Sequence, residues 1–526
     1  MQDQVIDRPS AISDTQYAKA VVQLRAALGA EGVIEDAPSR APFRDPFAPA
    51  GQDWYEPGVV LMPSSVEEVQ AVLRIANEHK TPIWTSGQGR NNGYGGASPR
   101  VSGSFVMSMK RMNRILEVDP VSATALIEPG VRFFDLYDHL RTHAPHLWMS
   151  VPDLGWGSIV GNTLDHGMGY TPFGDHVASQ CGMEVVLANG DVLRTGMGGM
   201  SNSRAWQVYK RGCGPSFDGL FMQSNYGVVT KMGTWLMPAP ECYMPGWLQL
   251  RNDSDLEILL ERLRPLMMDG TIANQPMIIN AVCAMSAFTQ RDAWFTGEGP
   301  MPQAIIDEIA NQPMLGAWVM RFALYGDEQV VARQRQIVED ALGTIPGATL
   351  NFAKYDGRNL PEFENPHERV QAGVPSIALD QMSRWYGGES GGHIGFSCPM
   401  PITGRDGATI RDLVRGEVNA AGLDYSGVII VSKRSMIHVG LVVFDTADAM
   451  QGQAAYAVSR NLVKTAAQLG YGEYRSHLDF MDLVADQYDF NNHAQRRFGE
   501  LIKDAVDPNG ILSPGKQGIW PAAMRS

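Results

Sequence analysis

The sequence is poor in cysteine, in long apolar runs and in positive charge. Its 526 residues contain five cysteines scattered along the chain: Cys181, Cys213, Cys242, Cys283 and Cys398. An odd, widely spaced set fits neither a disulfide framework nor a cysteine-rich zinc site, so we expect no metal and a reducing compartment. No stretch approaches the run of about 18 apolar residues that a membrane-spanning helix needs. The polar start at Met1–Asp14 lacks the apolar segment of an export signal, and we therefore expect a cytoplasmic protein without a membrane partner.

The balance of charge excludes a second class of partner. Asp and Glu number 57 against 43 Lys and Arg, which gives a formal net charge of −14. A phosphate backbone would be repelled by such a surface, so nucleic acid is not expected to bind. The length predicts two to four domains of roughly 100–200 residues each.

Glycine is the residue in excess. The sequence has 55 glycines, more than the usual share of about 7%. They concentrate in four segments, residues 87–103, 155–174, 190–199 and 387–395. We interpret these segments as candidate loops whose backbone cradles a ligand.

The pattern around the first glycine segment predicts mixed α and β structure. Ser65 and Glu68 are spaced as a capping box for a helix over Val66–His79. A short strand at Ile83–Thr85 then leads into the glycine loop at residues 87–93. Further strands are expected at 105–109, 124–127 and 184–187, the last before an Asn189-Gly190 hairpin turn.

A second unit begins after Met237-Pro238-Ala239-Pro240, which can continue neither a helix nor a central strand. Beyond it, helices expected at 328–342 and 447–469 alternate with strands expected at 318–325 and 437–444. This alternation is typical of a sheet covered by helices. After a break at Leu469-Gly470, the turn-rich segment 507–516 is expected to rejoin the first unit.

Taken one at a time, the motifs have ordinary explanations. The glycine loop is not a Rossmann fingerprint, because its third glycine comes one residue late and no helix follows. The segment 388–392 fits the G-x-S-x-G pattern of hydrolases, but a strand rather than a helix follows the serine. His139 and His143 have metal-ligand spacing without a nearby carboxylate or cysteine cluster to complete a site. His393 lies in a glycine-rich strand, where a bulky ligand can approach the backbone.

Together, however, the motifs resemble the vanillyl-alcohol oxidase family of flavoproteins, particularly its bacterial members that oxidise eugenol and 4-alkylphenols. The resemblance spans about residues 60–520 in family order. It rests on residues 87–95 (GQGRNNGYG), 152–155 (PDLG), 169–176 (GYTPFGDH), 392–397 (GHIGFS), 474–475 (YR) and 514–516 (PGK).

The resemblance implies an α+β fold of two domains. A discontinuous FAD-binding domain of the p-cresol methylhydroxylase type would comprise residues 1–238 and 470–526, and an α/β cap domain, residues 239–469, would cover the flavin. The residues implied to hold FAD, largely through their backbone, are Ser86, Gly87, Gln88, Gly89, Arg90, Asn91, Asn92, Pro152, Gly157, Ser158, Asn162, Gly227, Val229, Arg475 and Lys516.

The same resemblance implies that His393 is joined covalently to the flavin 8α-methyl group. Tyr386 is a second candidate for this attachment, because one relative links its flavin through tyrosine. Cys398 stands where relatives commonly have proline, so the sequence departs from the family at the end of this strand.

The resemblance also implies a chemistry, in which Tyr94, Tyr474 and Arg475 bind a phenol oxygen. A free phenol has a pKa of about 10, and an adjacent cation lowers the pKa of an acid by about 1–3 units. The phenolate then expels hydride from the para benzylic carbon to the flavin and leaves a p-quinone methide, which takes up water or loses a proton. Asp153 is implied to exchange that proton, and a carboxylate that faces an apolar pocket would have a raised pKa suited to this task. Tyr170 and Ser397 are implied to line the pocket.

The implied function is an oxidase of para-substituted phenols such as 4-ethylphenol, eugenol and vanillyl alcohol, which reduces O₂ to hydrogen peroxide and forms a homodimer. One alternative is a dehydrogenase of the same fold that passes electrons to a cytochrome c. Another is a flavin-binding carrier or sensor without turnover. The carrier is disfavoured, because it needs none of Tyr94, Asp153, Tyr474 and Arg475.

Overall fold

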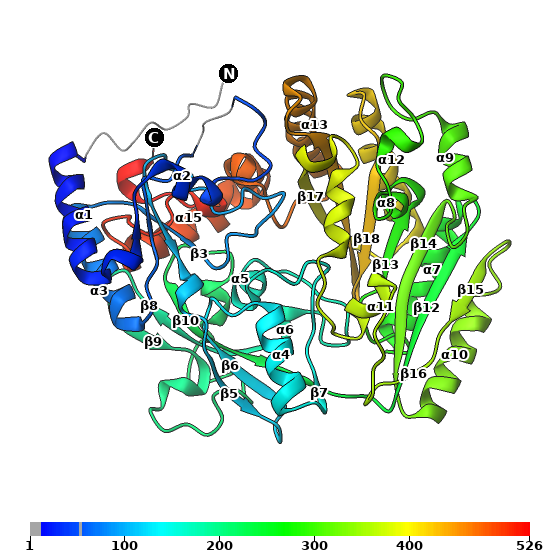
Figure 1. Ribbon diagram of the computed structural model, residues 1–526, viewed down its shortest axis with the longest axis horizontal. Coiled ribbons are helices and arrows are strands. Elements are labelled where there is room, and N and C mark those ends of the chain that lie inside the picture. Colours follow the sequence, from blue (N-terminus) through cyan, green and yellow to red (C-terminus); the bar gives the residue numbers. More distant parts are fainter. Residues whose placement is uncertain (1–11, 52–54, 526) are drawn as a thin grey trace.

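The structure, a computed structural model, describes residues 12–51 and 55–525. The polar start at Met1–Asp14 lies mostly outside these residues. Within them, no helix combines the length and the apolar character needed to cross a bilayer. The chain forms two lobes: a first lobe built from residues before 240 and after 470, and a cap lobe built from the middle of the chain (Figure 1).

Two sheets form the centre of the first lobe. One has the order β1-β2-β4-β3, with β2, β4 and β3 parallel, and the other is antiparallel with the order β5-β6-β10-β8-β9. The strands are β1 (Val33–Ile34), β2 (Val59–Leu61), β3 (Ile83–Ser86), β4 (Phe105–Ser108), β5 (Ile115–Asp119), β6 (Thr124–Ile127), β8 (Gln180–Val186), β9 (Val192–Arg194) and β10 (Val228–Trp235), with β7 (Leu147–Trp148) paired to β11 (Met237–Pro238).

Helices cover these sheets. They are α1 (Asp14–Leu28), α2 (Ala37–Arg40), α3 (Val66–His79), α4 (Phe133–His143), α5 (Ile159–Leu164), α6 (His176–Ser179), α14 (Met481–Gln487) and α15 (Phe490–Val506). The apolar stripe of α3, which includes Val69, Leu73 and Ala76, is buried, and α3 packs against α1. This burial is what the helical spacing of apolar residues predicts.

The local predictions for the first lobe are confirmed with two corrections. Helix α3 has the predicted bounds, and the Asn189-Gly190 turn joins β8 to β9, although β8 begins at Gln180 rather than Glu184. The capping box is only half formed: Ser65 accepts from the Glu68 amide, but the Glu68 carboxylate accepts from Ser64 instead of Ser65. Ser64 offers two donors, its amide at 2.7 Å and its hydroxyl at 3.0 Å, which explains the preference.

The cap lobe is one large antiparallel sheet with the order β15-β12-β14-β13-β18-β19-β17, to which β16 adds beside β12. Its strands are β12 (Cys242–Leu250), β13 (Met277–Asn280), β14 (Trp318–Gly326), β15 (Thr349–Phe352), β16 (Tyr355–Asp356), β17 (Gly391–Pro401), β18 (Ser426–Val431) and β19 (Ser435–Asp445). Its helices are α7 (Asp255–Met268), α8 (Ala281–Ser286), α9 (Gln303–Ala310), α10 (Glu328–Leu342), α11 (Pro366–Gln371), α12 (Gly404–Ala420) and α13 (Ala449–Gln468). A sheet with helices was the predicted arrangement, and α10 has the predicted bounds.

The cap sheet has one face against helices and one face toward the first lobe. On β19, Met436 packs toward Gly407 of α12, whereas Val439 and Leu441 point to the opposite side, where they line a cavity. Side chains alternate along a strand, so a single strand serves both faces.

After α13 the chain returns to the first lobe. Leu512 forms a parallel bridge with Ile83 beside the start of β3. Lys503, fully buried, donates to Asp507 at 2.7 Å and to the Asn225 carbonyl at 2.8 Å, which holds this segment in place. The chain changes lobe after β11 and after α13, where we propose the domain boundaries at 238/239 and 469/470.

Candidate functional site

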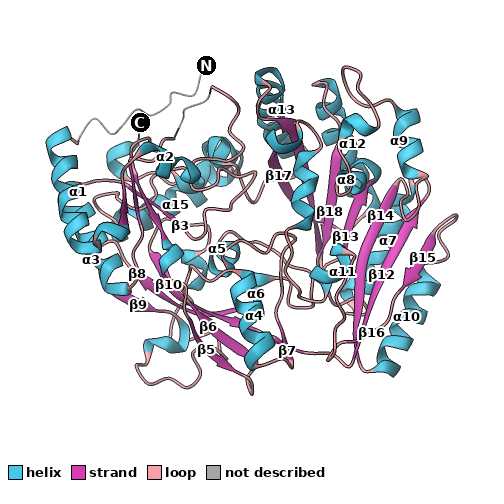
Figure 2. Ribbon diagram, in the orientation of Figure 1, coloured by secondary structure: helices cyan, strands magenta, loops and turns pink. Residues whose placement is uncertain are grey.

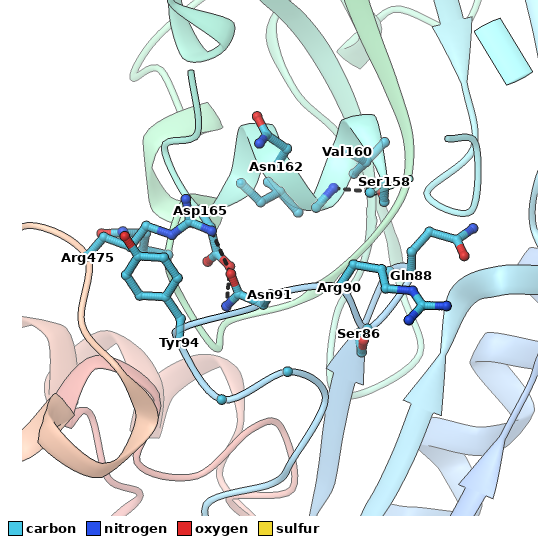
Figure 3. A pocket seen from close by; sticks show the side chains of 18 of the residues that line it. Ser86, Gln88, Arg90, Asn91, Tyr94, Ser158, Val160, Asn162, Asp165 and Arg475 are labelled. Atoms are coloured by element: carbon cyan, nitrogen blue, oxygen red, sulfur yellow. Dashed lines mark hydrogen bonds between the residues drawn. The ribbon is translucent and has the colours of Figure 1, made fainter. Parts of the chain in front are cut away.

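A cavity of about 400 Å³ lies where the two lobes meet. Figure 3 shows part of its wall. Apart from Tyr386, every site residue predicted from the sequence lines it: Ser86, Gly87, Gln88, Gly89, Arg90, Asn91, Asn92, Tyr94, Pro152, Asp153, Gly157, Ser158, Asn162, Tyr170, Gly227, Val229, His393, Ser397, Tyr474, Arg475 and Lys516. The fold therefore brings together residues that are up to 430 positions apart in the sequence, from Ser86 to Lys516.

The wall from the first lobe comes mainly from loops. The loop after β3 turns at Gly89 and Gly93, whose φ angles of 67° and 77° favour glycine. A Cβ added at Gly87 would lie 2.8 Å from the Cβ of Ser158, so the loop packs closely on the start of α5. Ser158 caps α5 by accepting from the Gly161 amide at 2.9 Å.

This wall fits FAD. A Cβ at Gly157 would meet no atom within 4 Å, so the backbone there borders open space that a cofactor can fill. Two buried donors on the cavity wall, Nε1 of Trp156 and Nε of Arg475, have no hydrogen-bond partner among the residues that the structure describes. Such donors suit the phosphate and carbonyl oxygens of a dinucleotide.

His393 faces this loop from β17 of the cap lobe. Its Nδ1 lies 3.1 Å from the Ser383 hydroxyl, and a Cβ at Gly93 would collide with its Nε2. Burial lowers the pKa of His393 to about 4, which outweighs the opposing influence of Asp45. The imidazole is therefore neutral at pH 7 and keeps a lone pair.

Tyr386, the second candidate for a flavin link, does not line the cavity. Its hydroxyl accepts from the Asp424 amide at 2.9 Å, and its ring lies against the Arg291 guanidinium inside the cap lobe. Because Tyr386 is tied into this separate buried cluster, it is not positioned for attachment.

Tyr94, Ser397, Tyr474 and Arg475 meet at one end of the cavity. The Arg475 guanidinium lies 4.2 Å from the Tyr94 ring centre, and the Tyr94 hydroxyl lies 3.0 Å from the Ser397 hydroxyl. The Tyr474 amide donates to the Ser397 carbonyl at 3.0 Å, which ties the segment to β17. Burial, reinforced by Tyr94, raises the pKa of Tyr474, so this side chain stays a hydroxyl donor at neutral pH.

Arg475 is held by an amide rather than by a carboxylate. Its Nη2 donates to Oδ1 of Asn91 at 2.5 Å, and among the described residues it has no ion-pair partner. Asp165 lies beyond Asn91 and pairs with Lys516 at 3.4 Å. Burial opposes ionisation of Asp165, but Lys516 and Arg475 outweigh it and lower the pKa of its carboxyl.

The surroundings of Asp153 differ from the prediction. Instead of facing an apolar pocket, the Asp153 carboxylate pairs with Arg321 of β14 at 2.5 Å and accepts from the Tyr170 hydroxyl at 2.5 Å. The prediction was wrong because Arg321, 1% exposed, reaches it from the cap sheet. Arg321 also contacts Nδ1 of His367 at 2.7 Å, and burial and Arg321 hold the pKa of His367 well below its usual range.

Sequence reasoning missed three residues of this region. Arg321 is the one charged residue within the apolar strand 318–325, and that contrast was a usable signal. Asp165 follows α5 without any motif of its own. Glu473, 4% exposed, accepts from the Ser397 amide at 3.4 Å while its Oε2 has no partner. Burial raises the pKa of Glu473 well above its usual range, so this carboxyl is neutral.

The remaining motifs have structural roles. Ser390 of the G-x-S-x-G segment lies in a short 3-10 turn and donates to Asp445 at 2.6 Å. Strand β17 continues through Cys398 to Pro401, so the departure at Cys398 does not end it. His139 and His143 stack with ring centres 4.3 Å apart on the exposed side of α4.

Two family models match the chain. The FAD binding domain family matches residues 57–196, and the C-terminal domain of FAD linked oxidases matches residues 433–517. Over 514 residues the chain is 37% identical to the flavoprotein subunit of 4-cresol dehydrogenase (hydroxylating) from Pseudomonas putida, with 97% of each chain covered. The chain therefore belongs to the vanillyl-alcohol oxidase and p-cresol methylhydroxylase family of FAD-linked oxidoreductases.

Solved structures agree over nearly the whole chain. A 4-ethylphenol oxidase from Gulosibacter chungangensis, in complex with isoeugenol, has a TM-score of 0.94 and 36% identity, covering 98% of this chain and 100% of that one. A p-cresol methylhydroxylase with substrate bound has a TM-score of 0.92 and 36% identity, covering 98% and 99%. The expected family and fold are confirmed.

Proposed function

We propose that the protein is an FAD-dependent oxidase of para-substituted phenols, including 4-alkylphenols such as 4-ethylphenol, eugenol and vanillyl alcohol. The relatives described above are named for p-cresol (4-cresol) and for 4-ethylphenol, which are both para-substituted phenols. We further propose that the enzyme reduces O₂ to hydrogen peroxide and acts as a homodimer.

The observation that carries the proposal is the unpaired charge of Arg475. Of the cationic side chains around the cavity, Arg321 pairs with Asp153 and Lys516 pairs with Asp165. Arg90 is exposed and lies over the Trp156 ring. Arg475 lies over the Tyr94 ring and donates to the neutral Asn91, and no ion pair joins it to another described residue. A buried cation without a counter-ion is costly, so this end of the cavity is suited to an anion. A phenolate supplies the charge and, unlike a phosphate, a flat ring.

In this proposal Arg475 and the hydroxyls of Tyr94 and Tyr474 bind the substrate oxygen. The cation lowers the pKa of a bound phenol by about 1–3 units, and each unit is worth about 1.4 kcal/mol. FAD, when bound, accepts the hydride that the ionised ring releases from its para benzylic carbon. The product of that release is a p-quinone methide, which is electrophilic at the same carbon.

Asp153 then decides the fate of the quinone methide. Paired with Arg321, its carboxylate is available as a base, and it takes a proton from an attacking water or from the adjacent carbon of the side chain. Water addition gives an alcohol, and proton loss gives an alkene. A substrate that already carries a benzylic hydroxyl loses the hydroxyl proton instead and gives an aldehyde.

We propose that His393 carries the flavin covalently at the 8α-methyl group. Its neutral imidazole supports this role, because one of its ring nitrogens then has a lone pair that can form the bond. Acid-precipitated protein should remain yellow, and His393→Ala should release the flavin. If acid precipitation of the wild-type protein releases the yellow flavin into the supernatant, the covalent linkage is refuted.

The function is tested by adding 4-ethylphenol, eugenol, vanillyl alcohol or 4-propylguaiacol to the holoenzyme. We expect the flavin to bleach without air and hydrogen peroxide to accumulate in air. If the flavin stays oxidised with all four substrates, phenol oxidation is rejected and the flavin-binding carrier or sensor becomes the favoured hypothesis.

A cytochrome-linked dehydrogenase is the second candidate, favoured by the full-length similarity to the subunit of 4-cresol dehydrogenase. It predicts fast reduction of cytochrome c with 4-ethylphenol and little peroxide in air. Measuring the rates of reduction of O₂ and of cytochrome c on the same preparation distinguishes the oxidase from the dehydrogenase.

A further inference from the structure

Arg475, Asn91 and Asp165 lie next to one another on the cavity wall (Figure 3). Lys516 extends this row of polar side chains beyond Asp165. Arg475 Nη2 donates to Asn91 Oδ1 at 2.5 Å, and Asn91 Nδ2 donates to Asp165 Oδ2 at 3.4 Å. The other oxygen of Asp165 lies 3.4 Å from Nζ of Lys516. A neutral amide thus stands between a guanidinium and a carboxylate.

Two half-buried opposite charges this near each other would ordinarily pair, because partial burial strengthens their attraction. The Asn91 amide occupies the space between them and satisfies both, its oxygen toward the cation and its nitrogen toward the anion. Asp165 consequently pairs with Lys516, and Arg475 keeps its charge for the cavity. The Nε of Arg475 has no hydrogen-bond partner within residues 12–51 and 55–525.

The backbone holds Asn91 in this place. Its carbonyl accepts from the amides of Tyr94 and Gly96, both at 3.1 Å, within the turn of the glycine loop. Asn91 therefore positions two phenol-binding groups: Tyr94 through its backbone and Arg475 through its side chain.

We propose that Asn91 is a positioning residue that holds Arg475 without neutralising it, and so preserves the positive charge that selects an ionised phenol. This rests on the proposed function. The other titratable groups that influence Arg475 or its neighbours in this cluster are Tyr94 in the loop, Tyr474 and Glu473 beside Arg475, and Asp165, His166 and Lys516 beyond Asn91.

The proposal predicts that two substitutions have opposite effects. Asn91→Asp replaces the amide by a carboxylate of the same shape, which would pair with Arg475 and cancel its charge. Asp165→Asn removes a nearby negative charge and leaves more positive charge in the cavity. Asn91→Ala removes the hydrogen bond to Arg475 without adding a negative charge. It therefore distinguishes neutralisation of Arg475 from loss of that hydrogen bond.

The test measures binding of 4-bromophenol, which has no benzylic hydrogen to lose, to holoenzyme between about pH 6 and pH 10 by the change in flavin absorbance. Benzoate, ionised throughout, is the second probe. We expect Asn91→Asp to weaken binding of both probes by about 10- to 1000-fold, corresponding to 1–3 pKa units, and to move the onset of phenolate binding to higher pH. We expect Asp165→Asn to tighten binding and move that onset to lower pH.

The outcomes separate this inference from the proposed function. If both variants weaken binding, or if Asn91→Ala matches Asn91→Asp, the role of Asn91 is overturned even when 4-ethylphenol still bleaches the wild-type flavin. A second outcome is that phenols neither bind nor react while Asn91→Asp weakens benzoate binding and Asp165→Asn strengthens it. In that case the phenol function is rejected and the role of Asn91 is supported. If neither probe binds the wild type, both fail. Should Asn91→Asp lose its flavin, the sign of the Asp165→Asn effect decides.

Discussion

The two walls of the cavity are built differently. The wall from the first lobe comes mainly from loops, several of which turn at glycines, whereas the cap lobe is a regular antiparallel sheet (Figure 2). Residues of that sheet line the other side of the cavity. Ile430, Val439, Leu441 and Ser397 belong to this second wall, and Arg321 reaches Asp153 from the same sheet. Glycine-rich loops can fit closely around a cofactor that does not vary. Side chains on a sheet can be exchanged to suit different substrates without altering the backbone.

This difference predicts different consequences of substitution. Apart from His393, which we propose carries the flavin, changes in the cap wall and at Asp153 should impair turnover while the flavin stays bound. Changes in the glycine wall should affect the attachment of the flavin first.

The largest effect is expected at Asp153, where the two walls meet. Asp153→Ala removes the proposed base and should lower kcat by about 10²- to 10⁴-fold while the protein keeps its flavin absorbance. Tyr170→Phe is the matched control, because it removes only the hydrogen bond to Asp153, and it should have a smaller effect. Normal turnover in Asp153→Ala would exclude this residue from the mechanism.

Arg321→Met comes next, because it leaves the Asp153 carboxylate without its cation. Breaking a buried ion pair in this way costs about 3–5 kcal/mol, and we expect the free energy of unfolding in urea to fall by that amount. The double variant Arg321→Met, Asp153→Asn should regain stability but not activity. If the double variant is no more stable than Arg321→Met, the unpaired Asp153 carboxylate is not the cause of the fall in the free energy of unfolding.

In the glycine wall, Gly93→Ala should disturb the attachment of the flavin. Gly93 has a φ of 77°, and its added Cβ would collide with Nε2 of His393. We expect part of the flavin to appear in the supernatant after acid precipitation. Gly89→Ala shares the left-handed strain at a φ of 67° but does not face His393, so it controls for strain alone.

The smallest effect is expected for Glu473→Gln, behind the phenol end of the cavity. Burial raises the pKa of Glu473 in the folded protein, so its contribution to stability is complete below the pKa of the unfolded chain and declines as the pH rises toward the folded pKa. Glutamine does not titrate. The variant should therefore gain stability relative to the wild type between about pH 5 and pH 8, with each pKa unit worth about 1.4 kcal/mol.

Thermal unfolding of both proteins across this pH range measures that gain. A constant difference between them would mean that Glu473 ionises normally in the fold. Activity should change little, because a neutral side chain replaces a neutral carboxyl.

Much of the fold was predictable because its signals are local. The apolar spacing of α3 and α10 and the Asn189-Gly190 turn depend on neighbours in sequence, and they were identified within a residue or two. The boundaries of longer strands were less accurate. Strand β8 begins four residues before its predicted start, because its first residues pair with β10, which comes much later in the chain.

The sequence by itself determined the glycine wall and the residues at the phenol end. A loop that needs glycine at particular positions, and the adjacent Tyr474 and Arg475, can both be recognised in a short stretch of sequence. Only the tertiary structure decided the charge of the site. Arg321 lies 168 positions from Asp153, and Asn91 lies 384 from Arg475. Whether a buried cation is neutralised or left free depends on which group folding brings within a few ångströms, and no local pattern records that distance.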